Sequence, residues 1–124
     1  MFHEHKAVVR ALYSAMKGAT ADTIESVLAA YTTPDWHWRG MHPFYEQYGS
    51  LNVARVFWGP LMTSLTRMQR REDIFFAGDN SVGEGTWVVS MGHFMGLFDA
   101  VWLGIRPTKK IVMLRYCEFN RIEG

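Results

Sequence analysis

The sequence has 124 residues, 48% of them hydrophobic and 20% charged, and its 13 basic and 12 acidic side chains give a formal net charge of +1. A chain of this length is expected to form a single domain, residues 1–124, with an ordinary hydrophobic core. The near-neutral charge and the lack of a basic stripe argue against nucleic acid as a partner.

Compartment and membrane association are also constrained by the composition. The single cysteine, Cys117, excludes a disulfide within the chain and indicates a reducing compartment, so we expect the cytoplasm. No segment approaches the roughly 18 apolar residues of a membrane span, and the charged N-terminal segment lacks the apolar core of a secretion signal. We therefore expect no membrane partner.

Two helices are predicted at the start of the chain. Residues 3–17 carry apolar side chains three and four positions apart, which is typical of a helix with one buried face. Asp22 and Glu25 form a capping-box pattern that predicts the start of a second helix there. Residues 32–34, Thr-Thr-Pro, are expected to end it.

An extended segment, a loop and a third helix follow. Residues 35–40 place tryptophans at alternate positions, as in a strand, and residues 41–50 contain proline and Gly-Ser, as in a loop. Residues 51–65 repeat apolar side chains every four positions and predict a helix. Gly-Pro at 59–60 predicts a kink or a restart within it.

The second half of the chain has the period of β-strands. Strands are predicted over residues 68–77, 84–95 and 109–121, with a turn at 78–83 and a long connection at 96–108. Helices followed by antiparallel strands predict an α+β fold.

Aromatic residues before and within the third helix are the first site candidates. Trp36 and Trp38 share one face of the extended segment and would form a wall of a ligand cavity, with His42 at its mouth and Phe57 nearby. The alternative is that Trp36 and Trp38 are ordinary core residues, and this interpretation is favoured for each tryptophan considered by itself.

His93 is the second candidate. It shares a strand face with Trp87 and Met91, so it is either a buried acid–base group or a core histidine that bonds to the backbone.

Glu118 is the third candidate. It shares a face of the last strand with Tyr116, where desolvation would suit it to proton transfer. The alternative is a glutamate at the rim of the sheet, paired with an arginine such as Arg115 or Arg121.

The spacing of the histidines does not fit a dedicated metal site. His37 and His42 are five positions apart, across a strand end and a loop, and His93 stands alone. The sequence also lacks a phosphate-binding glycine loop, so we expect neither a metal nor another cofactor.

Four short segments carry a family resemblance. They are HPFYEQYG at 42–49, GHFMG at 92–96, LGIRPTKK at 103–110 and RYCEFNRIEG at 115–124. With the order of the predicted elements, they resemble the SnoaL-like polyketide cyclase family of the nuclear transport factor 2-like superfamily. The resemblance implies a cone, in which a strongly curved antiparallel sheet wraps around N-terminal helices and encloses a pocket. It also implies a homodimer formed through the outer face of the sheet.

The resemblance further implies chemistry without a cofactor. Cyclases of the family close rings by aldol chemistry, in which an acidic side chain takes a proton beside a carbonyl. His93 lies in the family's G-H-x-x-G segment, although many relatives carry the histidine one position later, where this sequence has Phe94. Glu118 and His42 also fall in matching segments.

One departure from the family concerns its last strand. Relatives continue past the F-x-R-I-E segment into a strand whose aspartate is thought to be the general base, whereas this sequence ends at Gly124. The sequence is therefore expected to be either a fragment or a variant that lacks the family's last strand. In either case we expect a sheet edge to be exposed beside residues 109–121.

Two functions are predicted. The first is a cofactor-free acid–base enzyme of cyclase, isomerase or lyase type that acts on a small, largely apolar carbonyl compound. The second is a non-catalytic module of the same fold that binds a small apolar or aromatic ligand or dimerises. The catalytic candidates are His93, Glu118 and His42. The pocket candidates are Trp36, Trp38, Phe57, Trp87, Met91 and Tyr116.

Overall fold

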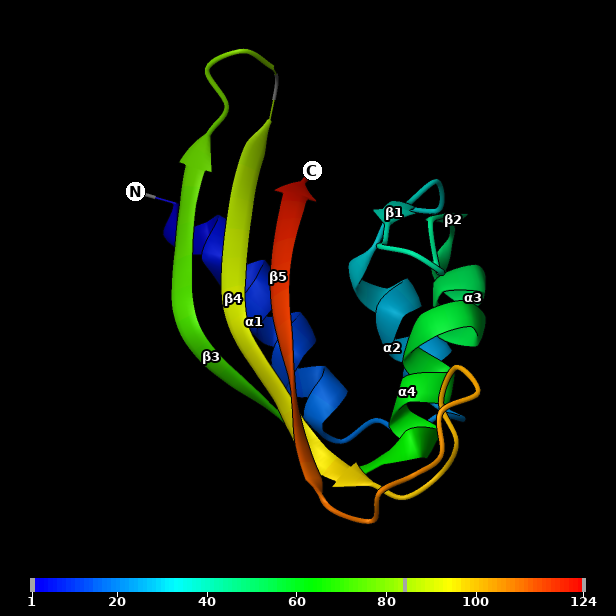
Figure 1. Ribbon diagram of the computed structural model, residues 1–124. Helices are drawn as coiled ribbons and strands as arrows, with labels where there is room; N and C mark the ends of the chain where they lie inside the picture. The colour runs from blue at the N-terminus through cyan, green and yellow to red at the C-terminus, as the bar shows by residue number, and fades with distance from the viewer. Residues whose placement is uncertain (1, 84, 124) are drawn as a thin grey trace.

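The structure, a computed structural model, describes residues 2–83 and 85–123. The first residue of the predicted strand 84–95 and the terminal Gly124 lie outside the described residues. A strongly curved antiparallel sheet has α1 crossing behind it, and the remaining helices lie beyond its concave side (Figure 1). The predicted α+β class, with helices first and antiparallel strands later, is confirmed.

The first two helices differ in how well their starts were predicted. Helix α1 spans His3–Lys17 and buries Val9 and Tyr13, as predicted. Helix α2 spans Ile24–Tyr31, and its N-cap is Thr23 without a side-chain cap hydrogen bond. The capping-box prediction at Asp22 is therefore wrong. The Thr23 hydroxyl instead accepts a hydrogen bond from the backbone N–H of Thr20 at 2.8 Å, which forms a turn before the helix.

A small hairpin follows α2. Strand β1, His37–Arg39, pairs antiparallel with β2, Glu46–Tyr48. The extended segment was predicted, but the partner strand lies inside the predicted loop 41–50. Three residues are too few to show a strand period in the sequence.

The third helical region is continuous but irregular. It consists of α3 (Ser50–Val53), a π-helical turn η1 (Ala54–Trp58) and α4 (Gly59–Ser64). The N–H of Gly59 donates to the carbonyl of Ala54, and a Cβ at Gly59 would lie 2.7 Å from that oxygen. The predicted kink at Gly-Pro is thus a π turn just before the proline, which cannot donate a helical hydrogen bond.

The main sheet has the strand order β3-β4-β5, with β3 at Leu65–Asp79, β4 at Thr86–Phe98 and β5 at Ile111–Ile122. Strand β3 is irregular in two places, between Thr66 and Gln69 and between Glu72 and Ile74. Bulges of this kind bend a strand and increase its twist, which fits the curvature of the sheet.

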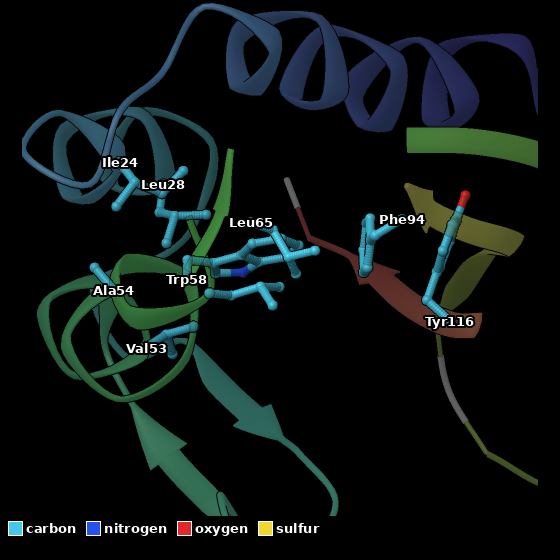
Figure 2. Packing of buried hydrophobic residues seen from close by; sticks show 9 residues of the cluster. Ile24, Leu28, Val53, Ala54, Trp58, Leu65, Phe94 and Tyr116 are labelled. Carbon is cyan, nitrogen blue, oxygen red and sulfur yellow. The ribbon is translucent and has the colours of Figure 1, made fainter. Parts of the chain in front are cut away.

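The core joins the helices to the sheet. Trp58, Phe94 and Tyr116 form a row of rings that runs from the helical region to the sheet (Figure 2), with ring centroids 5.4 and 4.6 Å apart. Ile24 and Leu28 of α2 pack at the helical end of this row. None of the described helices is both long and apolar enough to cross a membrane.

Candidate functional site

The register of the sheet decides which residues face the helices. Paired residues of antiparallel strands lie on one face, and successive residues alternate between faces. Phe94 is buried in the core next to Tyr116, and Tyr116 and Glu118 are two positions apart on β5. These residues therefore lie on the face toward the helices, called the inner face below, and the opposite face is called the outer face.

His93, Met91 and Trp87 lie on the outer face, because they alternate with Phe94 along β4. His93 pairs in register with Arg115, and its Nδ1 lies 3.4 Å from a carboxylate oxygen of Asp73. The prediction that these three residues share a site with the inner-face residues is wrong. The sequence showed which residues share a face, but it did not show which face the helices cover.

The other predicted candidates pack elsewhere. His42 lies in the exposed turn between β1 and β2, where its Nδ1 is hydrogen-bonded to the Tyr45 hydroxyl. Trp38 packs on Phe57 with a ring-centroid distance of 5.2 Å, and both residues and Trp36 lie against the main core. The alternative of ordinary core residues therefore fits the two tryptophans better than a cavity wall.

Glu118 is part of a connected polar cluster on the inner face. The guanidinium Nη1 of Arg70 donates to one oxygen of Glu118 at 2.8 Å, and the Tyr13 hydroxyl donates to the other at 2.8 Å. The side chain of Arg70 is 11% exposed and that of Glu118 is 26% exposed. Glu118 thus has an arginine partner, as one alternative expected, but this arginine comes from β3 rather than from its own strand.

Small residues of β4 make this pairing geometrically feasible. Strand β4 separates β3 from β5, so Arg70 must reach across it. The inward positions of β4 between the two partners are Ser90 and Gly92, the register partners of Glu118 and Tyr116. A large side chain at either position would fill the space that the guanidinium occupies.

Aromatic rings surround the guanidinium of Arg70. Its central carbon lies 3.6 Å from the ring centroid of Tyr13, 4.7 Å from Tyr116, 4.9 Å from Phe94 and 5.8 Å from Trp58. The faces of aromatic rings attract cations, most strongly where water is excluded. The rings and Glu118 together hold the charge of Arg70 in a mostly apolar setting.

The electrostatics keep Tyr13 neutral and Arg70 charged. Burial and the neighbouring carboxylate of Glu118 raise the pKa of Tyr13 above its ordinary value, so the phenol remains a hydrogen-bond donor. Burial acts to lower the pKa of Arg70, but attraction to Glu118 and Tyr13 outweighs it, so the pKa of Arg70 is raised.

A cavity of about 410 Å³ opens beside this cluster. It lies between the C-terminal half of α1, the region of η1 and α4, and the inner face of the sheet. Its volume falls within the range of small-molecule sites, roughly 300–1,000 Å³. The lining residues are Tyr13, Met16, Lys17, Trp58, Met62, Met68, Gln69, Arg70 and Phe94.

Several of these residues could not be recognised as site residues from the sequence. Tyr13 lies on the predicted buried face of the first helix, but its position there did not indicate that its hydroxyl belongs to a polar cluster. Arg70 lies in the polar run MQRRED, and the irregularities of β3 on either side of it break the alternation that assigns faces. The clearest available signal was Glu118, because a carboxylate among apolar neighbours requires a cationic partner.

Glu118 and Tyr116 are the predicted site residues that belong to the polar cluster. Within residues 2–83 and 85–123, no group of three or more His, Cys, Asp or Glu side chains is placed to hold a metal ion. Comparisons with protein-family models, with curated proteins and with solved structures found no match for this chain. We therefore interpret the site from its own geometry.

Proposed function

We propose that this domain binds a small, largely apolar molecule in the cavity between α1, the π turn and the inner face of the sheet. The observation that carries the proposal is the cavity itself, about 410 Å³ with a mainly apolar lining and a few polar groups at one wall. Met16, Met62 and Met68 contribute flexible side chains that adapt to the shape of a ligand.

The fold supports the same proposal. A strongly curved sheet with helices beyond its concave side fits a cone of the nuclear transport factor 2-like type (Figure 1). The short motifs that resemble the SnoaL-like family add to this argument. Folds of this type serve many activities, so the residues of the cavity must decide the function.

Cofactor-free acid–base catalysis on a carbonyl compound is a second candidate, and one observation favours it. The Tyr13 phenol and the Arg70 guanidinium lie together at the cavity wall, where they would stabilise negative charge on a carbonyl oxygen. Among the described residues, the cavity lining includes no carboxylate or histidine, and both oxygens of Glu118 already accept hydrogen bonds. None of the groups described at the cavity is a free base, so binding is the better-supported function.

The outer face of the sheet supports a homodimer. Five large apolar side chains on this face are exposed by 47–66%, namely Ile74, Phe76, Ile111, Met113 and Phe119. These side chains lie on either side of the polar row Arg71, His93 and Arg115. Exposed apolar surface bordered by polar residues is typical of a protein interface. We therefore propose that two copies associate through it and leave the two cavities free.

Thermal unfolding in the presence of small apolar carbonyl compounds tests the proposal. A compound at about one hundred times its Kd should stabilise the protein by roughly 2.7 kcal/mol. Met62→Trp, which fills the cavity, should abolish that stabilisation, whereas Met41→Trp on the exposed turn should preserve it. Equal stabilisation of both variants would show that the compounds bind outside the cavity.

Turnover of any bound compound, followed by mass spectrometry, tests the catalytic candidate. Tyr13→Phe should slow turnover, because it removes the phenol that lines the cavity. His93→Gln on the outer face should not change it. Slower turnover only in the His93 variant would contradict the assignment to the cavity.

A further inference from the structure

We infer that the molecule bound in the cavity carries a single acidic group, of the carboxylate class, held by Arg70 and Lys17, with an apolar body along the methionines and aromatic rings. This inference rests on the proposed function and specifies its ligand.

The charges around the cavity favour one negative charge. Of the residues that the structure describes, two cationic side chains, Arg70 and Lys17, and no acidic side chain line the cavity. Glu118 lies behind Arg70 and compensates one of the two charges through its 2.8 Å contact. The site is left with one net positive charge, which suits a monoanion better than a neutral or cationic molecule.

The hydrogen bonding of Arg70 also favours an acidic ligand. Its Nη1 is bonded to Glu118, but its Nη2 is buried and has no hydrogen-bond partner among the described residues. The neighbouring Tyr116 hydroxyl is hydrogen-bonded to Ser90 at 2.8 Å. A buried charged donor without an acceptor is unfavourable. A carboxylate oxygen is among the strongest acceptors for a guanidinium.

The rest of the lining suits an apolar body. Met16, Met62 and Met68 come from three separate elements, and Trp58 and Phe94 add flat apolar surface. These side chains offer no hydrogen-bond donor apart from the indole N–H of Trp58, and the methionine sulfurs are only weak acceptors. Affinity for the body of the ligand therefore depends on its apolar area, and the acidic group sets its orientation.

Three probes with one tail and different head groups test the inference by isothermal titration calorimetry. They are decanoate, 1-decanol and decyltrimethylammonium. Decanoate should bind roughly tenfold to hundredfold more tightly than 1-decanol, in line with the strength of charge-assisted hydrogen bonds. The cationic probe should bind most weakly.

The outcomes separate the inference from the proposed function. If 1-decanol binds as tightly as decanoate at the cavity, the inference fails and the proposed function stands. If none of these probes and none of the apolar carbonyl compounds binds, both fail.

Neighbouring arginines supply a matched pair of variants. Arg70→Gln removes the cavity cation, and Arg71→Gln makes the same charge change on an exposed outer-face residue. The first should abolish the preference for decanoate over 1-decanol, and the second should keep it. Equal preferences in the two variants would overturn the inference.

Lys17 keeps the inference testable if Arg70→Gln does not fold. Lys17 is exposed at the end of α1, so Lys17→Gln should fold normally. It should weaken decanoate binding several-fold and leave 1-decanol binding unchanged. An unchanged decanoate affinity would contradict the role of Lys17.

Discussion

Arg70 joins stability and the proposed ligand binding in one residue. Its guanidinium is mostly buried, bonded to Glu118 and surrounded by four aromatic rings, and it also forms part of the cavity wall. Burying a charge is costly unless a partner compensates it, so Glu118 is required for Arg70 to remain where it is. Glu118, predicted as a catalytic group, is thus better understood as the residue that positions Arg70 and Tyr13.

Glu118→Gln should destabilise the protein by about 2–3 kcal/mol. The amide still accepts a hydrogen bond from Tyr13, but the charge of Arg70 loses its compensation. Breaking a fully buried pair costs about 3–5 kcal/mol, and the partial exposure of Glu118 reduces the effect. Urea unfolding measures the change.

Glu46→Gln is the matched control. It removes the carboxylate of the exposed Glu46, which lies 3.7 Å from His37, and should change stability by less than about 0.5 kcal/mol. A double-mutant cycle of Glu118→Gln with Arg70→Gln should show coupling between the two sites. Strictly additive effects would contradict the ion-pair account.

The pH dependence of stability reports on Tyr13. Its pKa is raised from 10.0 in the folded protein, so the folded state keeps the phenol proton at a pH where the unfolded chain releases it. The contribution of Tyr13 is therefore complete below pH 10 and is lost as the pH rises above that value. In that range stability should fall by up to about 1.4 kcal/mol per pH unit on account of this group.

Tyr13→Phe should remove this component and flatten the decline above pH 10. Chemical unfolding of both proteins between pH 8 and about pH 11 provides the comparison. Parallel curves for the two proteins would show that Tyr13 does not titrate differently in the folded and unfolded states.

At the scale of the elements, regular periodicity was predictable and local irregularity was not. Helix α1 and the three long strands follow from apolar spacing, because their buried faces repeat over many residues. The π turn at Ala54–Trp58 and the bulges of β3 depend on close backbone contacts that leave no periodic trace. These irregular segments place Trp58 and Arg70 at the cavity, which is why both residues were missed.

Gly92→Ala tests the packing of the bulge in β3. A Cβ at Gly92 would lie 2.0 Å from the carbonyl oxygen of Arg71 and 3.0 Å from the Cα of Glu72, so the two strands would have to separate. Overpacking of this kind costs roughly 1–3 kcal/mol. Thermal unfolding should show a clear loss of stability.

Gly78→Ala on β3 is the control, since a Cβ there meets nothing within 4 Å. It should be neutral or stabilise the protein by up to about 1 kcal/mol, because glycine weakens a strand. Equal losses in the two variants would indicate that glycine flexibility, rather than the close contact, matters at Gly92.

At the scale of the whole molecule, the two faces of the sheet have different environments. The inner face carries the polar cluster and the cavity, and the outer face exposes apolar side chains. Strand alternation grouped the residues of β4 and β5 correctly into two sets. Only the packing of the helices determines which set lines the cavity, so His93 and Glu118 could not be separated from the sequence.

Phe119→Glu tests the proposed homodimer. Phe119 is 65% exposed on the outer face, and a charge there should prevent two apolar faces from associating. Sedimentation velocity should show a dimer for the unmodified protein and a monomer for the variant. Val82→Glu, an equally drastic change at a 94% exposed residue of the β3–β4 turn, should remain dimeric. A monomeric unmodified protein would contradict the proposal.

The most direct test of the cavity as a ligand site is methionine-methyl NMR during a titration with decanoate. Met16, Met62 and Met68 line the cavity, whereas Met41 and Met113 are exposed on a turn and on the outer face. We predict large, saturable shifts for the first three methyl groups and small shifts for the other two. Shifts confined to Met113 and its outer-face neighbours, or no saturable shift at all, would contradict the central claim that the cavity binds a small molecule.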